Sequence, residues 1–573
     1  MVNTKQFCIK LVHCGNKNLA NKNDAAQKNV FFMPMGYFAL ANILKENQYD
    51  AEIIHSDFIS NDEFLDMIKN TSIDAVGFDC FWVNQSLSVI ETAGLIKKVR
   101  PDIFVFLGGY TASLFAKDIL ENHPQVDAII RGDGEVPLIE LCNRLKDSKT
   151  GGEEKKTDLS GISNLVWRDI DGNIKENDFS YLCTEEIINK LDFAAVDLLR
   201  GFEFYKTLSK FWTRFSPVNR SNMFLLEIGR GCQHACLFCG GNCEAQSIMN
   251  NRKKIVVRSI DSVIETIKKA KSFGYDTFYT CFEFQDSDQW FCSLFKRIKQ
   301  ENLSINFVYG SWGLPSKELI DAMAESCQYV VYEISPETSN ENLRKKNKDI
   351  RLFYTNDELE ERLGYINTKP NFKVQLYYGY YLVDDSEQTI CESIDYILNL
   401  VLKYPTLLEV EYSNFSTDPY SLLYIYPEKY DIQINVRSFN DYLDSIRQNY
   451  VDKKDLTADM RLYSPRNITS DIHFRIERRI KLLNYLFSIY NKTISGIFAR
   501  INRIDIVSKI LDDTNLQLVD GVSFDSNQVK NKIILMCKEK GLIDNELLAI
   551  IESEYKNSMT RKVVKPVPKI CLF

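Results

Sequence analysis

The sequence predicts an α/β protein with two successive series of alternating strands and helices, followed by a mostly helical carboxyl-terminal part. Short apolar runs alternate with amphipathic segments in residues 1–150 and again in residues 216–431, a pattern typical of parallel sheets covered by helices. Residues 151–215 begin with a polar, glycine-rich stretch and are interpreted as a connector. Residues 432–573 show longer helical spacing, for example in 472–490.

The first series contains five apolar runs, each of which predicts a buried strand. Strands are expected at 7–12, 51–55, 74–78, 103–107 and 127–130, and helices at 37–45, 64–69, 87–99, 112–121 and 136–145. This alternation predicts a doubly wound, Rossmann-like domain, whose ligands bind beyond the carboxyl ends of the strands. Asp171-Gly172 in the connector predicts a short hairpin.

The second series predicts a partial barrel. Strands are expected at 224–228, 277–284, 305–309, 329–334, 373–382 and 407–415, and helices at 260–273, 290–300, 317–326, 340–346 and 386–400. These six units predict a partial (β/α)6 barrel, because a complete barrel of eight units usually needs ~250 residues.

Composition and charge narrow the class of protein. The chain has 573 residues, of which 45% are hydrophobic and 26% charged, as in globular proteins with large cores. The net charge of −8 gives no overall footprint for nucleic acid, and the short basic run 252–254 is interpreted as a solvated helix entrance. No secretory signal and no apolar stretch long enough to cross a membrane is found. Fifteen scattered cysteines favour a reducing, cytoplasmic location.

One tight cysteine cluster stands out. Cys232, Cys236 and Cys239 have the spacing Cys-x3-Cys-x2-Cys directly after the first barrel strand, and Gly231 and Gly240 allow the backbone to bend tightly. Thiolates are the usual ligands of iron–sulfur clusters. Three of them can hold three corners of a 4Fe–4S cluster, which leaves the fourth iron open to a substrate.

Two other interpretations of these cysteines stay open. A zinc site would need a fourth ligand, and Cys243 or His234 could supply it. Alternatively, the three thiols are unrelated residues in a chain that contains fifteen cysteines.

The cysteine loop resembles the signature of the radical S-adenosylmethionine (SAM) superfamily, in which an aromatic residue precedes the third cysteine. The resemblance implies that the open iron chelates SAM and that one electron cleaves it to a 5′-deoxyadenosyl radical. It also implies that Phe238 lies beside the adenine of SAM, with Gly240 next to it.

Further SAM contacts follow from the same resemblance. The second barrel strand ends near Glu283 and Asp286, one of which would bind the SAM amino group, although the two glycines common there are absent. The fourth strand ends at Ser335 and Glu337, in the position of the segment that reaches the ribose and carboxylate. An alternative role for Ser335 and Ser339 is capping of the following helix.

The first domain resembles the cobalamin-binding domain that precedes the barrel in one large class of radical SAM enzymes. The implied cobalamin contacts lie on four segments at strand ends: Pro34, Gly36 and Tyr37; Ser86; Gly108, Gly109 and Thr111; and Gly132, Gly134 and Glu135. The Asp-x-His-x-x-Gly motif that ligates cobalt in the classical mutases is absent, and only His13 lies near that position. A vestigial domain without cobalamin is the alternative.

Both resemblances together imply a cobalamin-dependent radical SAM methyltransferase, which methylates an unactivated carbon through methylcobalamin and a 5′-deoxyadenosyl radical. The alternatives are a reaction without methylation on the same cofactors, such as a cyclisation, a rearrangement or an aminocarboxypropyl transfer, and a regulatory protein that holds zinc or a redox-sensing cluster. The implied partners are a small-molecule or peptide-like substrate and a low-potential electron donor of the flavodoxin or ferredoxin type. The catalytic residues and the roles of the carboxyl-terminal part and Cys571 have no prediction.

Overall fold

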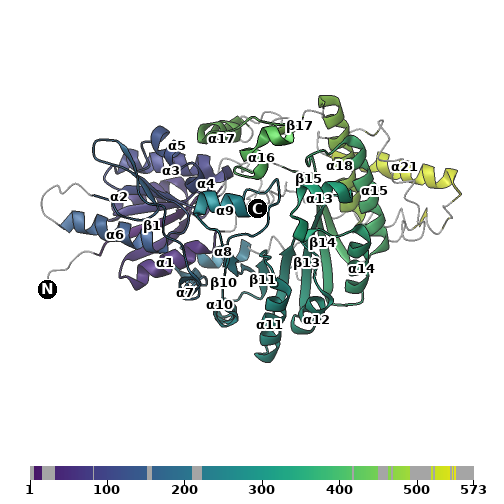
Figure 1. Ribbon diagram of the computed structural model, residues 1–573, viewed down its shortest axis with the longest axis horizontal. Helices are drawn as coiled ribbons and strands as arrows, with labels where there is room; N and C mark the ends of the chain where they lie inside the picture. The colour runs from purple at the N-terminus through teal and green to yellow at the C-terminus, as the bar shows by residue number, and fades with distance from the viewer. Residues whose placement is uncertain are drawn as a thin grey trace.

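The computed structural model describes residues 6–15, 33–81, 83–150, 158–208, 222–404, 406–415 and 418–448, and parts of 463–549. Two α/β bodies lie side by side, with the amino-terminal body on the left of Figure 1 and the partial barrel on the right. Cys571 lies outside the described residues.

The amino-terminal body contains a seven-stranded sheet in the order β2-β1-β3-β4-β5-β6-β7. The strands are β1 (Cys8–His13), β2 (Asp50–His55), β3 (Ala75–Asp79), β4 (Phe104–Gly108), β5 (Ala128–Ile130), β6 (Leu165–Arg168) and β7 (Ile174–Glu176). The first five are parallel, which confirms the doubly wound fold, and the expected hairpin at Asp171-Gly172 adds β6 and β7 antiparallel to the β5 edge.

The helices of this body are α1 (Gly36–Glu46), α2 (Asn61–Asn70), α3 (Ser86–Val99), α4 (Tyr110–Leu114), α5 (Ala116–Asn122) and α6 (Glu135–Thr150). The single helix expected at 112–121 is divided at Phe115, whose ring is buried. Helix α6 continues five residues beyond its predicted end at 145 and takes up the start of the expected loop. The connector adds α7 (Glu185–Ile188) and α8 (Phe202–Leu208).

The second body is an open sheet of six parallel strands in the order β15-β14-β13-β12-β11-β8. The strands are β8 (Met223–Leu225), β11 (Thr277–Thr280), β12 (Asn306–Ser311), β13 (Tyr329–Glu337), β14 (Phe372–Tyr380) and β15 (Leu407–Asn414). All six predicted strands are present, and β15 does not pair with β8, so the partial barrel is confirmed.

The helices around the barrel are α10 (Ile260–Ser272), α11 (Ser287–Gln300), α12 (Lys317–Ser326), α13 (Glu341–Asn347), α14 (Asn356–Ile366) and α15 (Glu387–Lys403). Several begin at a hydroxyl side chain that accepts a backbone N–H of the first turn, as at Ser259, Ser316, Thr355 and Ser386. Helix α14 and the elements after the first strand, β9 (Gly229–Arg230), α9 (Cys243–Asn250) and β10 (Val256–Val257), were not predicted.

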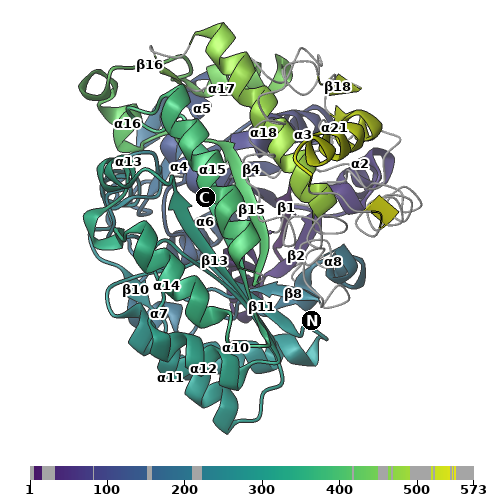
Figure 2. The ribbon, with the colours of Figure 1, turned by 90° about the vertical axis from the view of Figure 1, so that its right-hand side faces the viewer.

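After the barrel the chain returns to the amino-terminal body. This part contains α16 (Leu422–Ile425), β16 (Ile432–Ile434), α17 (Phe439–Ile446), β17 (Tyr463–Pro465), α18 (Ser470–Tyr490), β18 (Leu518–Val519), β19 (Ser523–Phe524) and α21 (Ser526–Glu539). Phe439 and Tyr442 of α17 pack on Phe115, with ring centroids 5.8 and 5.5 Å apart, and Figure 1 shows α17 above α3 and α5. Helix α18 instead lies along α15, as Figure 2 shows, where Arg475 pairs with Glu387.

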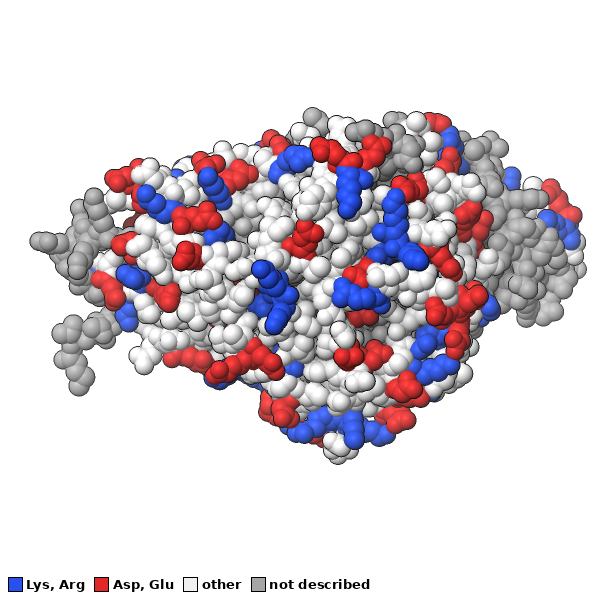
Figure 3. Space-filling model, viewed as in Figure 1, with Lys and Arg blue, Asp and Glu red and all other residues white. Residues whose placement is uncertain are grey.

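One apolar core runs from the first sheet through the connector into the barrel. Connector residues such as Phe193 and Tyr205 belong to it, so the two bodies share buried surface. Acidic and basic side chains are interspersed over the face drawn in Figure 3. Among the helices that the structure describes, none has the length and apolar character needed to cross a membrane.

Candidate active site

The cysteine triplet lies on the loop that follows β9, at the end of the first barrel strand. Cys236 is buried, and Cys232 and Cys239 are half-buried. The backbone N–H groups of His234 and Gly241 donate to Cys232 Sγ and Cys239 Sγ, each over 3.3 Å. Hydrogen bonds to sulfur are one of the features that set the reduction potential of a thiolate-bound cluster.

The environment of the three thiols suits metal ligation better than nucleophilic chemistry. Burial raises the pKa of all three, that of Cys236 to about 12, so the free thiols are protonated at neutral pH. A coordinating metal removes such protons. In the described part of the chain, no three His, Cys, Asp or Glu side chains, the cysteine triplet included, are arranged to hold a single metal ion.

Residues from distant parts of the barrel hold the cysteine loop in place. The N–H of Ala235 donates to Asp349 Oδ2 over 2.8 Å, and the N–H of Leu237 donates to the carbonyl of Asn347 over 2.9 Å. The sequence analysis missed both partners. Their only sequence signal is that the polar run 347–349 directly follows the helix predicted at 340–346.

Asp418 holds the far end of the same loop. Its Oδ2 accepts the N–H of Gly240 over 3.1 Å, and burial raises its pKa to about 7. A Cβ on Gly240 would lie 2.6 Å from the carbonyl oxygen of Pro419 and 2.7 Å from Asp418 Cβ. The close approach of these two segments therefore requires glycine at position 240.

The two candidates for the SAM amino group differ in their surroundings. Glu283 is partly buried at the end of the second barrel strand and accepts the N–H groups of Trp312 and Gly313 over 2.6 and 3.0 Å. Asp286 is exposed, precedes α11 with a φ of 64°, and makes no side-chain cap. Glu283 is the less exposed of the two and has fixed backbone partners, so it is the stronger candidate.

Ser335 and Glu337 lie buried at the end of the fourth barrel strand. The ammonium of Lys348, whose side chain is fully buried, donates to the Ser335 carbonyl and lies 3.5 Å from Glu337 Oε1. Burial raises the pKa of Glu337 to about 7 against the attraction of Lys348. Lys348 was not predicted, and it brings a positive charge to the place where a SAM carboxylate is expected.

The capping alternative for Ser335 and Ser339 is wrong. Helix α13 begins after Asn340, whose side chain accepts the N–H of Leu343 over 3.1 Å. β13 continues to Glu337, so Ser335 belongs to the strand. Ser339 instead shares a hydroxyl contact of 3.0 Å with Ser393 on α15.

Phe238 lies on the cysteine loop, directly before Cys239. It is half-buried and contacts Phe415 at the end of β15, with ring centroids 4.4 Å apart. A Cβ on Gly379 would collide with the Phe415 ring at 1.9 Å, so this aromatic pair depends on a glycine in β14.

Several of the predicted cobalamin residues lie together at the carboxyl edge of the first sheet. Gly109 has a φ of 97°, and a Cβ there would lie 3.0 Å from the backbone N of Phe81. Thr111 donates to the Phe81 carbonyl over 2.9 Å, and Ser86 begins α3. Gly108 ends β4, so these residues lie together beyond the carboxyl ends of β3 and β4.

The same edge contains a buried polar group. His13 Nδ1 lies 2.7 Å from Asp79 Oδ2, where β1 and β3 end side by side. In a sheet of this strand order the ligand crevice opens between these two strands. Burial raises the pKa of Asp79, and its other oxygen, Oδ1, is buried and accepts no hydrogen bond.

Other predicted cobalamin residues have structural partners. The Tyr37 hydroxyl donates to the carbonyls of Val12 and Gly77 over 3.2 and 2.9 Å, so this side chain ties α1 to β1 and β3. Gly36 begins α1, with Pro34 two residues before it. The contacts of Tyr37 therefore stabilise the sheet next to the predicted cobalamin site.

The predicted segment Gly132, Gly134 and Glu135 lies against the barrel. Gly132 has a φ of 64°, and a Cβ there would lie 3.2 Å from the Phe179 ring. Glu135 forms an ion pair of 2.7 Å with Arg230, two residues before the first cysteine of the triplet. This segment therefore contacts the frame of the cysteine loop.

Tyr110 connects the two candidate sites directly. It follows the glycine pair at the edge of the first sheet, and its hydroxyl donates to the carbonyl of Gly240, next to Cys239. Desolvation and the nearby Cys239 and Asp418 raise its pKa, so the hydroxyl stays protonated. The crevice of the first body and the cysteine loop thus face each other.

The residues present fit the two implied cofactors. Three thiols, one buried and two half-buried, on a glycine-bounded loop are a suitable donor set for a 4Fe–4S cluster. At the other site, Gly109 lets the chain pass close to the backbone of Phe81, and Asp79 has a buried oxygen, Oδ1, that accepts no hydrogen bond.

Comparison with known families assigns the two bodies to two different families. Residues 29–142 match the B12 binding domain, and residues 226–390 match the Radical SAM superfamily. The chain therefore combines a B12-binding domain with a radical SAM domain, which is the domain composition of the cobalamin-binding radical SAM enzymes.

Individual relatives agree with this class. The cytidylyl-2-hydroxyethylphosphonate methyltransferase of Streptomyces wedmorensis is 22% identical over 319 residues, which are 51% of this chain and 56% of that protein. The chain thus spans little more than half of this relative. The anaerobic magnesium-protoporphyrin IX monomethyl ester cyclase of Rubrivivax gelatinosus is 26% identical over 205 residues, 35% of this chain and 33% of that protein.

A solved structure shares the fold of both bodies. The radical SAM methyltransferase TsrM of Kitasatospora setae, with cobalamin and a 4Fe–4S cluster bound, matches with a TM-score of 0.59 and 13% identity. The match covers 88% of this chain and 99% of that chain. At this identity the likeness concerns the fold alone.

Proposed function

We propose that this protein is a cobalamin-dependent radical SAM methyltransferase that methylates an unactivated carbon of a small-molecule or peptide-like substrate. The observation that carries the proposal is the contact from Tyr110 to Gly240, which brings the crevice of the first body to the cysteine loop. When bound, the cluster supplies the electron that cleaves SAM, and cobalamin supplies methyl transfer.

The residues of the chain have binding and orienting roles in this proposal. Cys232, Cys236 and Cys239 ligate the cluster, and Phe238 and Gly240 border the adenine. Glu283 accepts from the SAM amino group, Lys348 neutralises its carboxylate, and Ser335 and Glu337 bind the ribose. The partly buried position of Glu283 and the burial of Lys348 support these roles, because burial strengthens charge recognition.

The cobalamin contacts are proposed at the edge formed by Ser86, Gly108, Gly109 and Thr111. Small residues there let a flat ring system approach the backbone. Electrons come from a flavodoxin- or ferredoxin-type donor in the cytoplasm, and the absence of disulfides among the described cysteines agrees with a reducing compartment.

The experiment that tests the proposal begins with cofactor content. The protein is purified anaerobically, reconstituted with iron, sulfide and hydroxocobalamin, and desalted. About four iron atoms per chain are expected for one cubane cluster, together with one corrin. Four iron atoms without corrin would leave a radical SAM enzyme with a vestigial first domain, and zinc without iron would contradict the proposal.

Products then separate two candidate reactions. With SAM and titanium(III) citrate as reductant, a methyltransferase forms S-adenosylhomocysteine as well as 5′-deoxyadenosine. 5′-Deoxyadenosine without S-adenosylhomocysteine favours a cyclisation or rearrangement on the same cofactors. The similarity to the Rubrivivax gelatinosus cyclase is the observation that supports this second candidate.

A further inference from the structure

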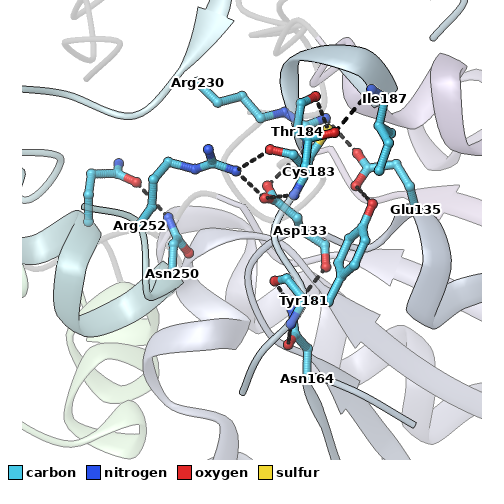
Figure 4. A network of polar contacts seen from close by, with 11 residues as sticks. Asp133, Glu135, Asn164, Tyr181, Cys183, Thr184, Ile187, Arg230, Asn250 and Arg252 are labelled. Atoms are coloured by element: carbon cyan, nitrogen blue, oxygen red, sulfur yellow. Dashed lines mark hydrogen bonds and ion pairs between the residues drawn. The ribbon is translucent and has the colours of Figure 1, made fainter. Parts of the chain in front are cut away.

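A buried ion-pair network joins the first body to the frame of the cysteine loop. Asp133, on the loop between β5 and α6, accepts from Arg230 Nη1 over 2.9 Å and also pairs with Arg252. Arg230 Nη2 reaches Glu135 over 2.7 Å. Figure 4 shows both arginine side chains directed toward these two carboxylates.

The network is balanced in charge. It contains two carboxylates and two guanidinium groups. The side chains of Arg252 and Glu135 are 4% and 5% exposed, and those of Asp133 and Arg230 are 10% and 19% exposed, so the network is mostly shielded from solvent. Asp133 Oδ2 also accepts the N–H of Cys183 over 2.8 Å, and Arg252 donates to the Cys183 carbonyl over 3.2 Å. Buried ion pairs add little net stability, because desolvation offsets their attraction, but they can fix one arrangement of the parts they join.

Both arginines belong to the frame of the cysteine loop. Arg230 ends β9, two residues before Cys232. Gly231 has a φ of 93°, and a Cβ there would lie 2.9 Å from Arg252 Cδ, so the Arg252 side chain covers the start of the loop. Antiparallel pairing of β9 with β10 brings the segment that contains Arg252, which precedes β10, close to Arg230.

The carboxylates belong to the ligand edge of the first sheet. The N–H of Gly132, on the same loop, donates over 2.8 Å to Ser113 Oγ on α4, the helix that follows Gly109. A shift of Asp133 would therefore move the loop that is tied to the predicted cobalamin edge.

We propose that Asp133, Glu135, Arg230 and Arg252 are positioning residues, which set the separation between the cobalamin crevice and the cysteine loop. The inference rests on the proposed function, since only a transfer between two sites needs that separation. It also gives the segment 132–135 a role different from the cobalamin contact that its sequence implied. A displacement of 1 Å can lower the rate of such a step by about 100-fold.

The test uses a charge-balanced variant of the full chain. Asp133→Asn with Arg252→Gln removes one charge of each sign and leaves the pair of Arg230 and Glu135 intact, so no buried charge loses its only partner. The matched control is Asp127→Asn, because Asp127 also accepts from a cation, Lys97 at 2.5 Å, and from a backbone N–H, that of Val105 at 2.7 Å. Asp127 lies within the first body, away from the barrel.

Two products of the reconstituted protein report on different parts of the molecule. 5′-Deoxyadenosine formed from SAM with titanium(III) citrate requires only the barrel site. S-adenosylhomocysteine formed when cobalamin is bound requires both sites. The double variant is expected to form S-adenosylhomocysteine at least about 10-fold more slowly, with 5′-deoxyadenosine within about 2-fold of the unmodified protein, and Asp127→Asn is expected to leave their ratio unchanged.

An unchanged product ratio in the double variant overturns the proposal, as does an equal change in Asp127→Asn. If the unmodified protein forms no S-adenosylhomocysteine, the proposed function fails, and hydrogen exchange of residues 229–241 decides the positioning role. Faster exchange there in the double variant than in the control supports it, and equal exchange refutes it. Iron and corrin content, measured in every variant, shows whether each protein is folded and loaded.

Discussion

Replacement of Lys348 by methionine is expected to weaken stability and SAM binding by separable amounts. The Lys348 side chain is fully buried, donates to the Ser335 carbonyl and lies 3.5 Å from Glu337 Oε1. Methionine has a similar length without charge, so the change removes the counter-charge of a buried carboxylate and leaves the packing nearly unchanged.

The size of the stability loss follows from the pKa of Glu337, which burial raises to about 7. Without Lys348 this carboxyl stays protonated, which at pH 8 costs about 1.4 kcal/mol. The lost hydrogen bond to Ser335 adds about 1 kcal/mol. At pH 6 Glu337 is already protonated in the unmodified protein, so only the second amount, about 1 kcal/mol, remains.

The loss of stability caused by Lys348→Met is expected to increase with pH. The folded pKa of Glu337 lies above its ordinary value of 4.5, so its protonated form stabilises the fold and that contribution is lost as pH rises toward 7. In Lys348→Met the pKa is higher still, so the loss continues at higher pH. The difference in free energy of unfolding between the two proteins therefore widens above pH 7.

Urea unfolding at pH 6 and pH 8, together with calorimetric titration of SAM into the reconstituted protein, measures both effects. Lys348→Met should lower SAM affinity by about 10-fold or more, because a charged hydrogen bond is lost. Addition of Glu337→Gln to this variant should recover the pH-dependent part of the stability but not the SAM affinity. Lys10→Met is the control, because Lys10 lies 3.0 Å from Glu52 far from the barrel. Unchanged SAM affinity in Lys348→Met would refute the reasoning.

Three further results are expected. Cys236→Ala should lower iron from about four atoms per chain to below about one after reconstitution, while Cys243→Ala, measured in the same way, should retain it. Gly109→Ala should lose bound cobalamin and about 1–3 kcal/mol of stability through backbone strain. The control is Gly94→Ala in the middle of α3, where no atom lies within 4 Å of the new Cβ, and this variant should gain up to about 1 kcal/mol of stability. Equal effects of the two substitutions would contradict this account. Burial raises the pKa of Asp385 from 3.8 to about 6, so the free energy of unfolding should fall by about 2 kcal/mol between pH 4 and pH 6. Asp385→Asn should remove that slope, and a persisting slope would assign it to other groups.

The sheets of both bodies could be predicted because each buried parallel strand is a continuous apolar run in its own sequence. The cysteine loop was equally visible, since its three thiols lie within eight residues. Helix α14 was missed although Thr355 and Glu358 form a capping box, which is a helix start signal in the sequence.

The partners of the site could not be predicted in the same way. Asp349 and Asp418 contact the cysteine loop from 114 and 178 residues away, so no local spacing connects them. Asp133 looked like part of a glycine-rich ligand segment, and only the fold shows Arg230, 97 residues later, at its side. Charge complementarity between distant segments leaves no pattern in a single sequence.

Helix α17 has a consequence for the order in which the protein is completed. The N–H of Phe439 bonds to Asp118, 321 residues earlier in the chain. At a synthesis rate of about 5–20 residues per second, the first body waits roughly 16–64 s on the ribosome before α17 exists. During that interval α17 does not yet cover the apolar surface around Phe115, so the nascent amino-terminal body is expected to depend on chaperones until translation reaches this helix.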